Sequence, residues 1–481
     1  MQVDERRRRG GCAASGSVRA AALVLTIVLA LPWGIARTQE PAARSVTRLG
    51  DLYARVTREN ARVKAAGAQV RAAHARTPGA KRPPDPQLQL GFMNYSLPSL
   101  TPMAPVGMVQ LQLMQMVPLG GKLGLAGRSL AAQASAIEER ARDVVWELRS
   151  QTAMAFYDLY AIDRQLSVSR ETLLLLQDIK RTAESMYRVG EGRQADVLRA
   201  QVEIARMAED TARMRAMRRT MVARIAALAN DSTERDYDGP VRPQFPDTIP
   251  GKSWLVSLAI RERPMVRAGV QDVRAADAAA ELARRELIPD LQIGAVYGQR
   301  RGTMTDTDAS GEPMTRSATE RMGSLMIGAS IPIFARDRQL KMREESNAMR
   351  AMADADLVAM RAETRGRVDE AYASLMRARH LAALYRSTVL PQAEATVASA
   401  MSSYRVGRVD FMTLLDDQMT VNRYRQELFV LEADEGKAWA DLEMLTARDL
   451  LDANSIATLS PVGGRDRNGG MAADAAQRGA Q

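Results

Sequence analysis

Methionine side chains crowd one short stretch of the sequence and bring several soft sulfur donors close together. They are Met93, Met103, Met108, Met114 and Met116. Thioethers select soft metal ions such as Cu(I), so the chemistry offered here is that of copper contact. Methionine is common in the whole chain, however, with 27 copies, and it often only fills space. We therefore predict no dedicated metal site and keep copper contact as an alternative.

The remaining reactive side chains do not form a catalytic group. The only two histidines, His74 and His380, are isolated in helical stretches, and the single cysteine is Cys12. Asp306 begins a segment like a calcium loop, but Ser317 stands where that loop needs a bidentate Glu. The sequence contains no phosphate-binding loop. We predict no catalytic residues, no metal, no cofactor and no enzyme.

The strongest pattern in the chain is a motif that occurs twice. Tyr-Arg-Val-Gly stands at 187–190 and again at 404–407. In each copy the glycine can end a helix in the left-handed conformation, and Asp196 or Thr413 can cap the helix that follows. The two copies predict two turns between helices, with tips at 187–196 and 404–413.

The rest of the chain repeats around these tips in the same order. Pro-Gln-Leu-Gln-Leu-Gly at 86–91 corresponds to Pro-Asp-Leu-Gln-Ile-Gly at 289–294, and Val-Pro-Leu at 117–119 to Ile-Pro-Ile at 331–333. Such self-similarity indicates one structural unit used twice. The units are predicted at 37–230 and 252–451, joined by a linker at 231–251 and followed by a disordered tail at 452–481.

Each unit combines short alternating segments with a very long helical one. Apolar and polar residues alternate at about 87–95, 108–117, 290–298 and 323–332, which predicts four strands, with a polar loop from about 298 to 321. One helix precedes each strand pair, at about 45–76 and 253–286. Helical periodicity then continues over 123–186 and 338–403, before the tips and the return helices. The predicted fold is mainly α, with paired long helices and a membrane β-barrel portion.

The N-terminus and the charge balance limit the function further. Residues 1–36 have the basic, apolar and small-residue regions of a signal peptide, and a retained anchor is the alternative. No later stretch approaches 18 uninterrupted apolar residues, so any membrane role falls to the strands. The net charge of +10 is spread along helices without clustered aromatics, which argues against nucleic-acid binding. Because four strands cannot close a barrel alone, the chain must assemble with its own copies.

From about Ser45 to Leu450 the sequence resembles the TolC-like outer-membrane efflux family. The repeated strand entries and tips carry the resemblance, together with Leu-Pro-Gln-Ala at 390–393; Gly-Gly-Lys at 120–122 is similar to heavy-metal branches. The resemblance implies a homotrimer with one twelve-stranded barrel in outer-membrane lipid and a helical coiled-coil tunnel in the periplasm. Such proteins are passive exit ducts. They dock on a periplasmic adaptor (membrane fusion) protein and, indirectly, on an RND or ABC pump of the inner membrane.

The resemblance also assigns roles to residues at the two tips. The narrow pore entrance falls on Asp196, Tyr404, Thr413 and Asp416, and adaptor contact on Val189, Gly190, Val406 and Gly407. Two positions depart from the family pattern: Thr413 replaces an acid, and Val409 replaces the base of a charge latch, whose place Arg405, Arg408 and Asp410 could take. The alternative is that Asp196 and the glycines only cap helices.

A second class of protein would share several of these features. A periplasmic coiled-coil adaptor or scaffold also has a signal peptide and paired long helices. It has no need for strands with one lipid-facing side, which the four alternating segments predict. Within the channel hypothesis, heavy-metal efflux, drug efflux and type I protein secretion stay open, since the pump and the adaptor select the cargo.

Overall fold

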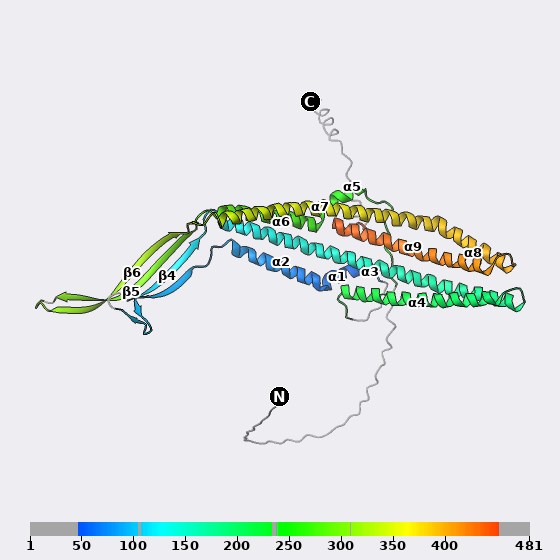
Figure 1. Ribbon diagram of the computed structural model, residues 1–481, viewed down its shortest axis with the longest axis horizontal. Coiled ribbons are helices and arrows are strands. Elements are labelled where there is room, and N and C mark those ends of the chain that lie inside the picture. Colours follow the sequence, from blue (N-terminus) through cyan, green and yellow to red (C-terminus); the bar gives the residue numbers. More distant parts are fainter. Residues whose placement is uncertain (1–46, 104–106, 233–236, 238, 308, 452–481) are drawn as a thin grey trace, which may run out of the picture. The chain divides into compact units, whose positions relative to one another are not determined.

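The computed structural model describes residues 47–451, apart from 104–106, 233–236, 238 and 308. The predicted signal peptide at 1–36 and the predicted tail at 452–481 lie outside these described residues. Helices dominate, and a small sheet accompanies them, which confirms the mainly α fold class (Figure 1).

Two hairpins of long helices make up most of the structure. The first joins α3 (Lys122–Arg188) to α4 (Gln194–Leu228), and the second leads from α7 (Gln339–Leu384) and α8 (Leu390–Arg405) into α9 (Phe411–Thr446). With 67 residues at about 1.5 Å each, α3 is roughly 100 Å long. It packs against α2, α4, α6 and α9, so it is the central helix of the fold.

The second long helix is interrupted, although a continuous helix is predicted over 338–403. The interruption is one π-helical turn, η1 (Tyr385–Val389), between α7 and α8. Pro391 is the second residue after it and has no backbone N–H to donate to the preceding turn. A local π-turn is a common way for a long helix to accommodate such a residue.

The helix before each strand pair is also divided, which corrects the prediction of one helix over 45–76 and one over 253–286. The first becomes α1 (Leu49–Glu59) and α2 (Ala61–Ala80), and the second α5 (Lys252–Glu262) and α6 (Pro264–Arg285). The breaks have different causes. Asn60 is extended and its Oδ1 accepts from the Arg62 N–H at 2.8 Å, whereas Arg263 stands before Pro264, which disfavours a helical conformation there.

Four strands form one antiparallel sheet in the order β1-β4-β5-β6. They are β1 (Gln87–Met93), β4 (Met108–Val117), β5 (Leu291–Thr307) and β6 (Pro313–Ala329); β2 (Tyr95–Ser96) and β3 (Thr101–Pro102) form a small separate pair. The prediction of a polar loop over 298–321 is wrong for most of that range, because β5 and β6 stay paired up to Thr307 and Pro313. Backbone pairing and threonine-rich sequence extend this hairpin where apolar alternation has ended.

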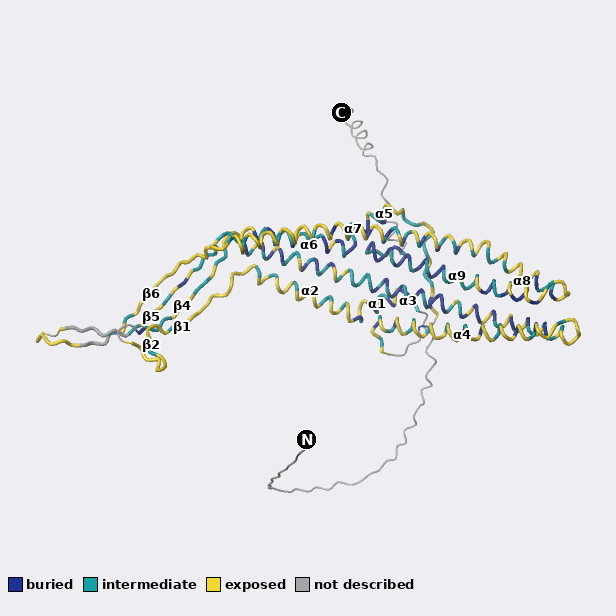
Figure 2. Tube along the Cα trace, viewed as in Figure 1, coloured by how far each residue is buried: buried dark blue, intermediate teal, exposed yellow. Residues whose placement is uncertain are grey.

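The register sorts the side chains of the sheet onto two faces. Leu88 pairs with Leu113, Leu113 with Ala295, and Ala295 with Leu325, so one face carries the aliphatic residues. Gln89, Gln112 and other glutamines lie on the opposite face. The aliphatic face is not covered by the chain: Leu325 and Ile327 are 73% and 71% exposed, and β1 and the described part of β6 are largely exposed in Figure 2.

Among the described residues, the helices include none whose length and hydropathy would let it cross a membrane.

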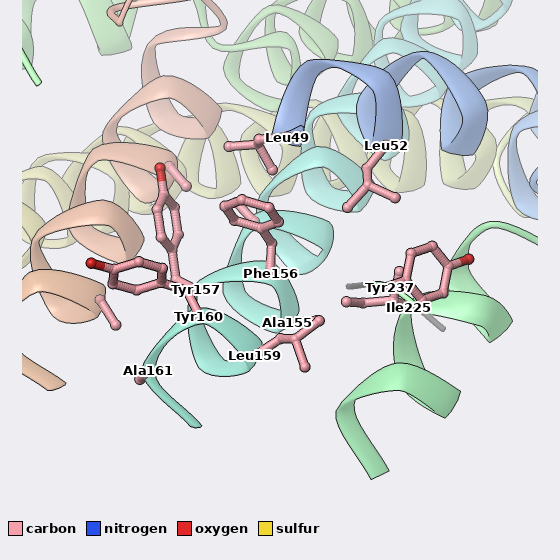
Figure 3. Close-up of a cluster of buried hydrophobic side chains, with 13 residues drawn as sticks. Leu49, Leu52, Ala155, Phe156, Tyr157, Leu159, Tyr160, Ala161, Ile225 and Tyr237 are labelled. Atoms are coloured by element: carbon pink, nitrogen blue, oxygen red, sulfur yellow. The ribbon is translucent and has the colours of Figure 1, made fainter. Parts of the chain in front are cut away.

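The main core lies where several helices meet. Leu49 and Leu52 from α1, Phe156 from α3 and Ile225 from α4 come together there, as Figure 3 shows. A second core contains Trp439 of α9, which is completely buried. A third joins the two helix hairpins near their tips. The helices therefore have well-packed interiors, in contrast to the uncovered sheet.

Candidate functional site

The two helix tips end their incoming helices with the same kind of turn. Gly190 and Gly407 adopt positive φ angles of 82° and 73°, as the sequence predicts for residues that end a helix. One residue later, the N–H of Glu191 donates to the Met186 carbonyl at 3.0 Å, and that of Arg408 to the Ser403 carbonyl at 2.9 Å. This pattern of hydrogen bonds is a Schellman motif in both tips.

The helices that leave the tips begin earlier than predicted. Residue Arg193 precedes α4 and provides no side-chain cap, whereas Asp410 precedes α9 and its Oδ2 accepts from the Met412 N–H at 3.2 Å. The prediction that Asp196 or Thr413 is the cap is therefore wrong, because both already stand in the first helical turn. At that place a carboxylate such as Asp196 still interacts favourably with the helix dipole.

Asp196 and Tyr404 come from different hairpins but lie close to each other. Both are buried in the single chain, at 7% and 5% exposure, and Tyr404 belongs to the third core with Phe411. The rings of Tyr404 and Phe411 meet edge to face, with centroids 5.6 Å apart. Burial raises the pKa of Tyr404, and the nearby carboxylates of Asp196 and Asp410 raise it further. The two predicted entrance residues are thus close enough for the Asp196 charge to act on the Tyr404 phenol.

The hydroxyl group of Tyr404 lacks a hydrogen-bond acceptor in the described part of the chain. Its Oη is buried and has no hydrogen-bond partner among the residues that the structure describes. An unpaired buried hydroxyl is unfavourable, so the Tyr404 hydroxyl does not itself stabilise the contact between the two hairpins.

The other predicted residues are on the surface of the tips. Val189 and Val406 are 69% and 67% exposed, which is unusual for valine and leaves an apolar contact on each tip. Nothing lies within 4 Å of a Cβ built on Gly190 or Gly407. The remaining pair, Thr413 and Asp416, is exposed on α9 and does not join the buried region.

Phe411 and Asp410 are the site residues whose roles the sequence did not indicate. Phe411 buries Tyr404, and Asp410 caps α9. One signal was present: the counterparts of these residues in the first tip are Gln194 and Arg193, so the two copies differ at the very positions that decide the environment of the tyrosine. The described residues contain no group of three His, Cys, Asp or Glu side chains arranged to hold a metal ion.

Comparison with known proteins identifies the architecture. A family model described as outer membrane efflux protein matches residues 52–231 and 255–448. The chain belongs to this family. The outer membrane efflux protein model matches twice, once in each half, and members of this family are channels of the outer membrane rather than enzymes. The resemblance to TolC-like proteins is thereby confirmed.

Solved structures of outer-membrane channels share the fold of this efflux protein. CusC, studied for transmembrane channel formation, is 17% identical with a TM-score of 0.69, over 83% of this chain and 92% of that chain. VceC from Vibrio cholerae is 16% identical with a TM-score of 0.69, over 83% and 96%. The outer membrane channel MtrE from Neisseria gonorrhoeae, in its open state, is 14% identical with a TM-score of 0.67, over 83% and 89%. No curated protein sequence matches the chain.

Proposed function

We propose that this protein is a trimeric exit duct of the outer membrane, which passively conducts substrates delivered by a pump. The observation that carries the proposal is the sheet: four strands with an uncovered aliphatic face and two outer strands, β1 and β6, that have no second neighbour among the described residues. In lipid such edges are not tolerated, because unpaired backbone groups cannot bond to water. Copies of the chain must supply the missing neighbours.

Closure by three copies gives a barrel of a size that membranes contain. Antiparallel pairing of β6 with β1 of the next copy joins the sheets edge to edge, and three copies supply twelve strands, within the range of outer-membrane barrels. The aliphatic face then meets lipid and the glutamine face lines the lumen. The long helices continue from the barrel as a tunnel that extends into the periplasm.

The helix tips are at the far end of this tunnel, where partners and a gate are needed. Val189, Gly190, Val406 and Gly407 offer open backbone and apolar contacts to a periplasmic adaptor protein. Asp196, Tyr404, Thr413 and Asp416 would surround the entrance, and a ring of carboxylates there would favour cations. The adaptor would link the duct to an inner-membrane RND or ABC pump, which supplies the energy.

Fractionation of the mature protein tests the assembly. We expect it in the outer membrane, and in detergent as a trimer that dissociates on heating. A soluble monomer in the periplasmic fraction would contradict the duct and favour the periplasmic adaptor or scaffold.

Bulky substitutions at the tips test the docking. In Gly190→Trp and Gly407→Trp the indole finds open space in the chain itself, so it should block the partner and abolish export while trimers persist. Gly190→Ala and Gly407→Ala are matched controls, since they carry the same strain at positive φ without the bulk. Equal export by the Trp and Ala variants would remove the adaptor role from these glycines.

A further inference from the structure

The strands of the sheet place their methionines on one face only. The register puts Met93, Met108, Met114, Met116, Met314, Met322 and Met326 on the face opposite the leucines. These are all the strand methionines whose side chains are described. If the two faces were equivalent, chance would distribute the seven methionines over both. If the methionines served to face lipid, they would lie on the same face as Leu88 and Ile327. Methionine and the branched aliphatic residues are therefore sorted differently.

Packing does not explain this arrangement. Met93, Met322 and Met326 are 44%, 45% and 42% exposed, so they fill no core. Their neighbours on this face are mainly glutamine, glycine and serine, and Val296 is the one branched aliphatic residue of the four strands there. If the face needed apolar surface alone, leucine and isoleucine would serve as well. What distinguishes methionine is its sulfur atom.

The thioethers also converge across neighbouring strands. Met93 is directly opposite Met108, and the Sδ of Met108 is 2.7 Å from the place of a Cβ on Gly298, the cross-strand partner of Met322. The absence of a side chain at Gly298 thus lets a thioether reach over β5 toward β6.

A second group repeats this arrangement four residues along β5, about 13 Å away at ~3.3 Å per residue. Gly294 has Met114 on one side and Met326 on the other. Side-chain atoms of both methionines come within 3.6 Å of the place of a Cβ on Gly294. The face therefore carries two successive groups of methionines, one around Gly298 and one around Gly294.

We propose that this face binds soft monovalent metal ions, Cu(I) or Ag(I), through methionine thioethers, and that such ions are a cargo of the duct. The proposal rests on the proposed function for the placement of this face along the lumen. Thioethers are neutral, soft ligands that prefer these ions to hard ones. The nearest strand cation, Arg300, is neutralised by an ion pair with Glu320 at 2.6 Å. Several exposed thioethers, arranged one after another along this face, suit an ion that must bind and then be released.

Silver binding by the purified trimer tests the proposal without a redox step. The probe is Ag(I) nitrate in chloride-free buffer, with X-ray absorption at the silver edge to identify the ligand atoms. The sequence has one cysteine, Cys12, which the predicted signal peptide would remove, so sulfur around silver in the mature protein must come from methionine. We expect sulfur neighbours. Coordination by oxygen and nitrogen alone would overturn the proposal.

A triple variant locates the site. Met93→Leu, Met108→Leu and Met322→Leu keep size and apolar character but remove the sulfur atoms around Gly298. We expect the number of Ag(I) ions bound per chain to fall by about half, while the group around Gly294 still binds. The matched control changes three exposed helix methionines, Met217→Leu, Met349→Leu and Met376→Leu, and should bind as the unchanged protein does. Equal losses in both variants would overturn the assignment to this face. Single substitutions replace the triple one if it does not form trimers.

Three further outcomes separate the hypotheses. A trimer that conducts ions in planar bilayers but shows no sulfur-bound silver would refute the metal cargo and leave the duct intact. A conductance block by an apolar dye that persists in the triple leucine variant, together with an unchanged amount of bound silver, would instead indicate an apolar organic cargo. Failure of trimer formation in the unchanged protein would count against the duct itself.

Discussion

The two helix tips share a helix-ending turn but place the same tyrosine in opposite environments. In the first tip Tyr187 is 48% exposed, whereas its counterpart Tyr404 is 5% exposed. Both tyrosines precede a glycine at positive φ by three residues, and both tips contain a Schellman motif. The first tip adds a hydrogen bond from the Gly192 N–H to the Met186 carbonyl at 3.0 Å. The helix-ending turn of the repeat has thus been kept while its surfaces have diverged.

An aromatic partner accounts for the difference. Phe411 follows the second tip and meets the Tyr404 ring, whereas the corresponding residue of the first tip is Gln194, which is exposed. The second tip therefore packs its tyrosine between the two hairpins, whereas the first leaves its tyrosine exposed. The two copies of a duplicated element can in this way present different surfaces on a similar turn.

Removing Phe411 should break this contrast most strongly. Phe411→Ala deletes a ring that is 1% exposed, and we expect a local loss of about 3–5 kcal/mol at the second tip. Gln194→Ala, the matched change in the first tip, should cost less than about 0.5 kcal/mol. Hydrogen exchange of the tip amides measures both. Losses of equal size would show that Phe411 does not set the difference.

A substitution at another position where the two tips differ should have the second largest effect on stability. Gly192 corresponds to Val409, but a Cβ on Gly192 would be 2.8 Å from the Tyr187 nitrogen. Because backbone cannot move aside easily, Gly192→Val should cost about 1–3 kcal/mol at the first tip. Limited proteolysis should then cut this tip and spare the second. Unchanged resistance would mean that the first tip can adopt the path of the second.

Much of the fold could be predicted because its signals are local. Gly190 and Gly407 mark turns through their own conformational freedom, and alternation at 108–117 defines β4 as the structure has it. The lengths of β5 and β6 were underestimated because backbone pairing extends them without an apolar pattern. The break at Asn60 depends on one side-chain cap, which periodicity does not reveal.

The candidate site was less predictable for the same physical reason. That Tyr404 is buried depends on Phe411 and on a second hairpin packed beside it, and neither is visible in the motif around the tyrosine. The caps were misplaced because several residues near each tip have suitable side chains, and only the start of the helix selects among them. Tertiary contacts, not local preferences, therefore decide which copy of the repeat buries its tyrosine.

The caps give the third prediction, which tests whether the tips can be made alike. Asp410→Ala removes the hydrogen bond to the Met412 N–H and should destabilise the start of α9 by about 1 kcal/mol. The reciprocal change, Arg193→Asp, should add a cap to α4 and stabilise it by a similar amount, roughly 0.5–1 kcal/mol. Hydrogen exchange in the first turns reports both effects. A neutral Arg193→Asp would show that the first tip holds its helix start in another way.

The smallest effect concerns the hydroxyl that distinguishes Tyr404 from phenylalanine. Its Oη is buried without a partner in the described chain, so Tyr404→Phe should leave the tip as stable or stabilise it by up to about 1 kcal/mol at neutral pH. Tyr187→Phe, on the exposed counterpart, is the control and should change nothing.

The pH dependence sharpens that test. Burial and the nearby carboxylates raise the pKa of Tyr404 above its ordinary value of 10.0, so the packed tip favours the neutral phenol. The packed tip then binds more protons than the open one above pH 10, and its stability must fall as the pH rises through the raised pKa. The unchanged protein should therefore lose protection at this tip in strong base while Tyr404→Phe keeps more of it. Identical profiles of protection against pH in the two proteins would mean that the Tyr404 phenol titrates as an exposed group. That result would contradict the burial of Tyr404 between the two hairpins.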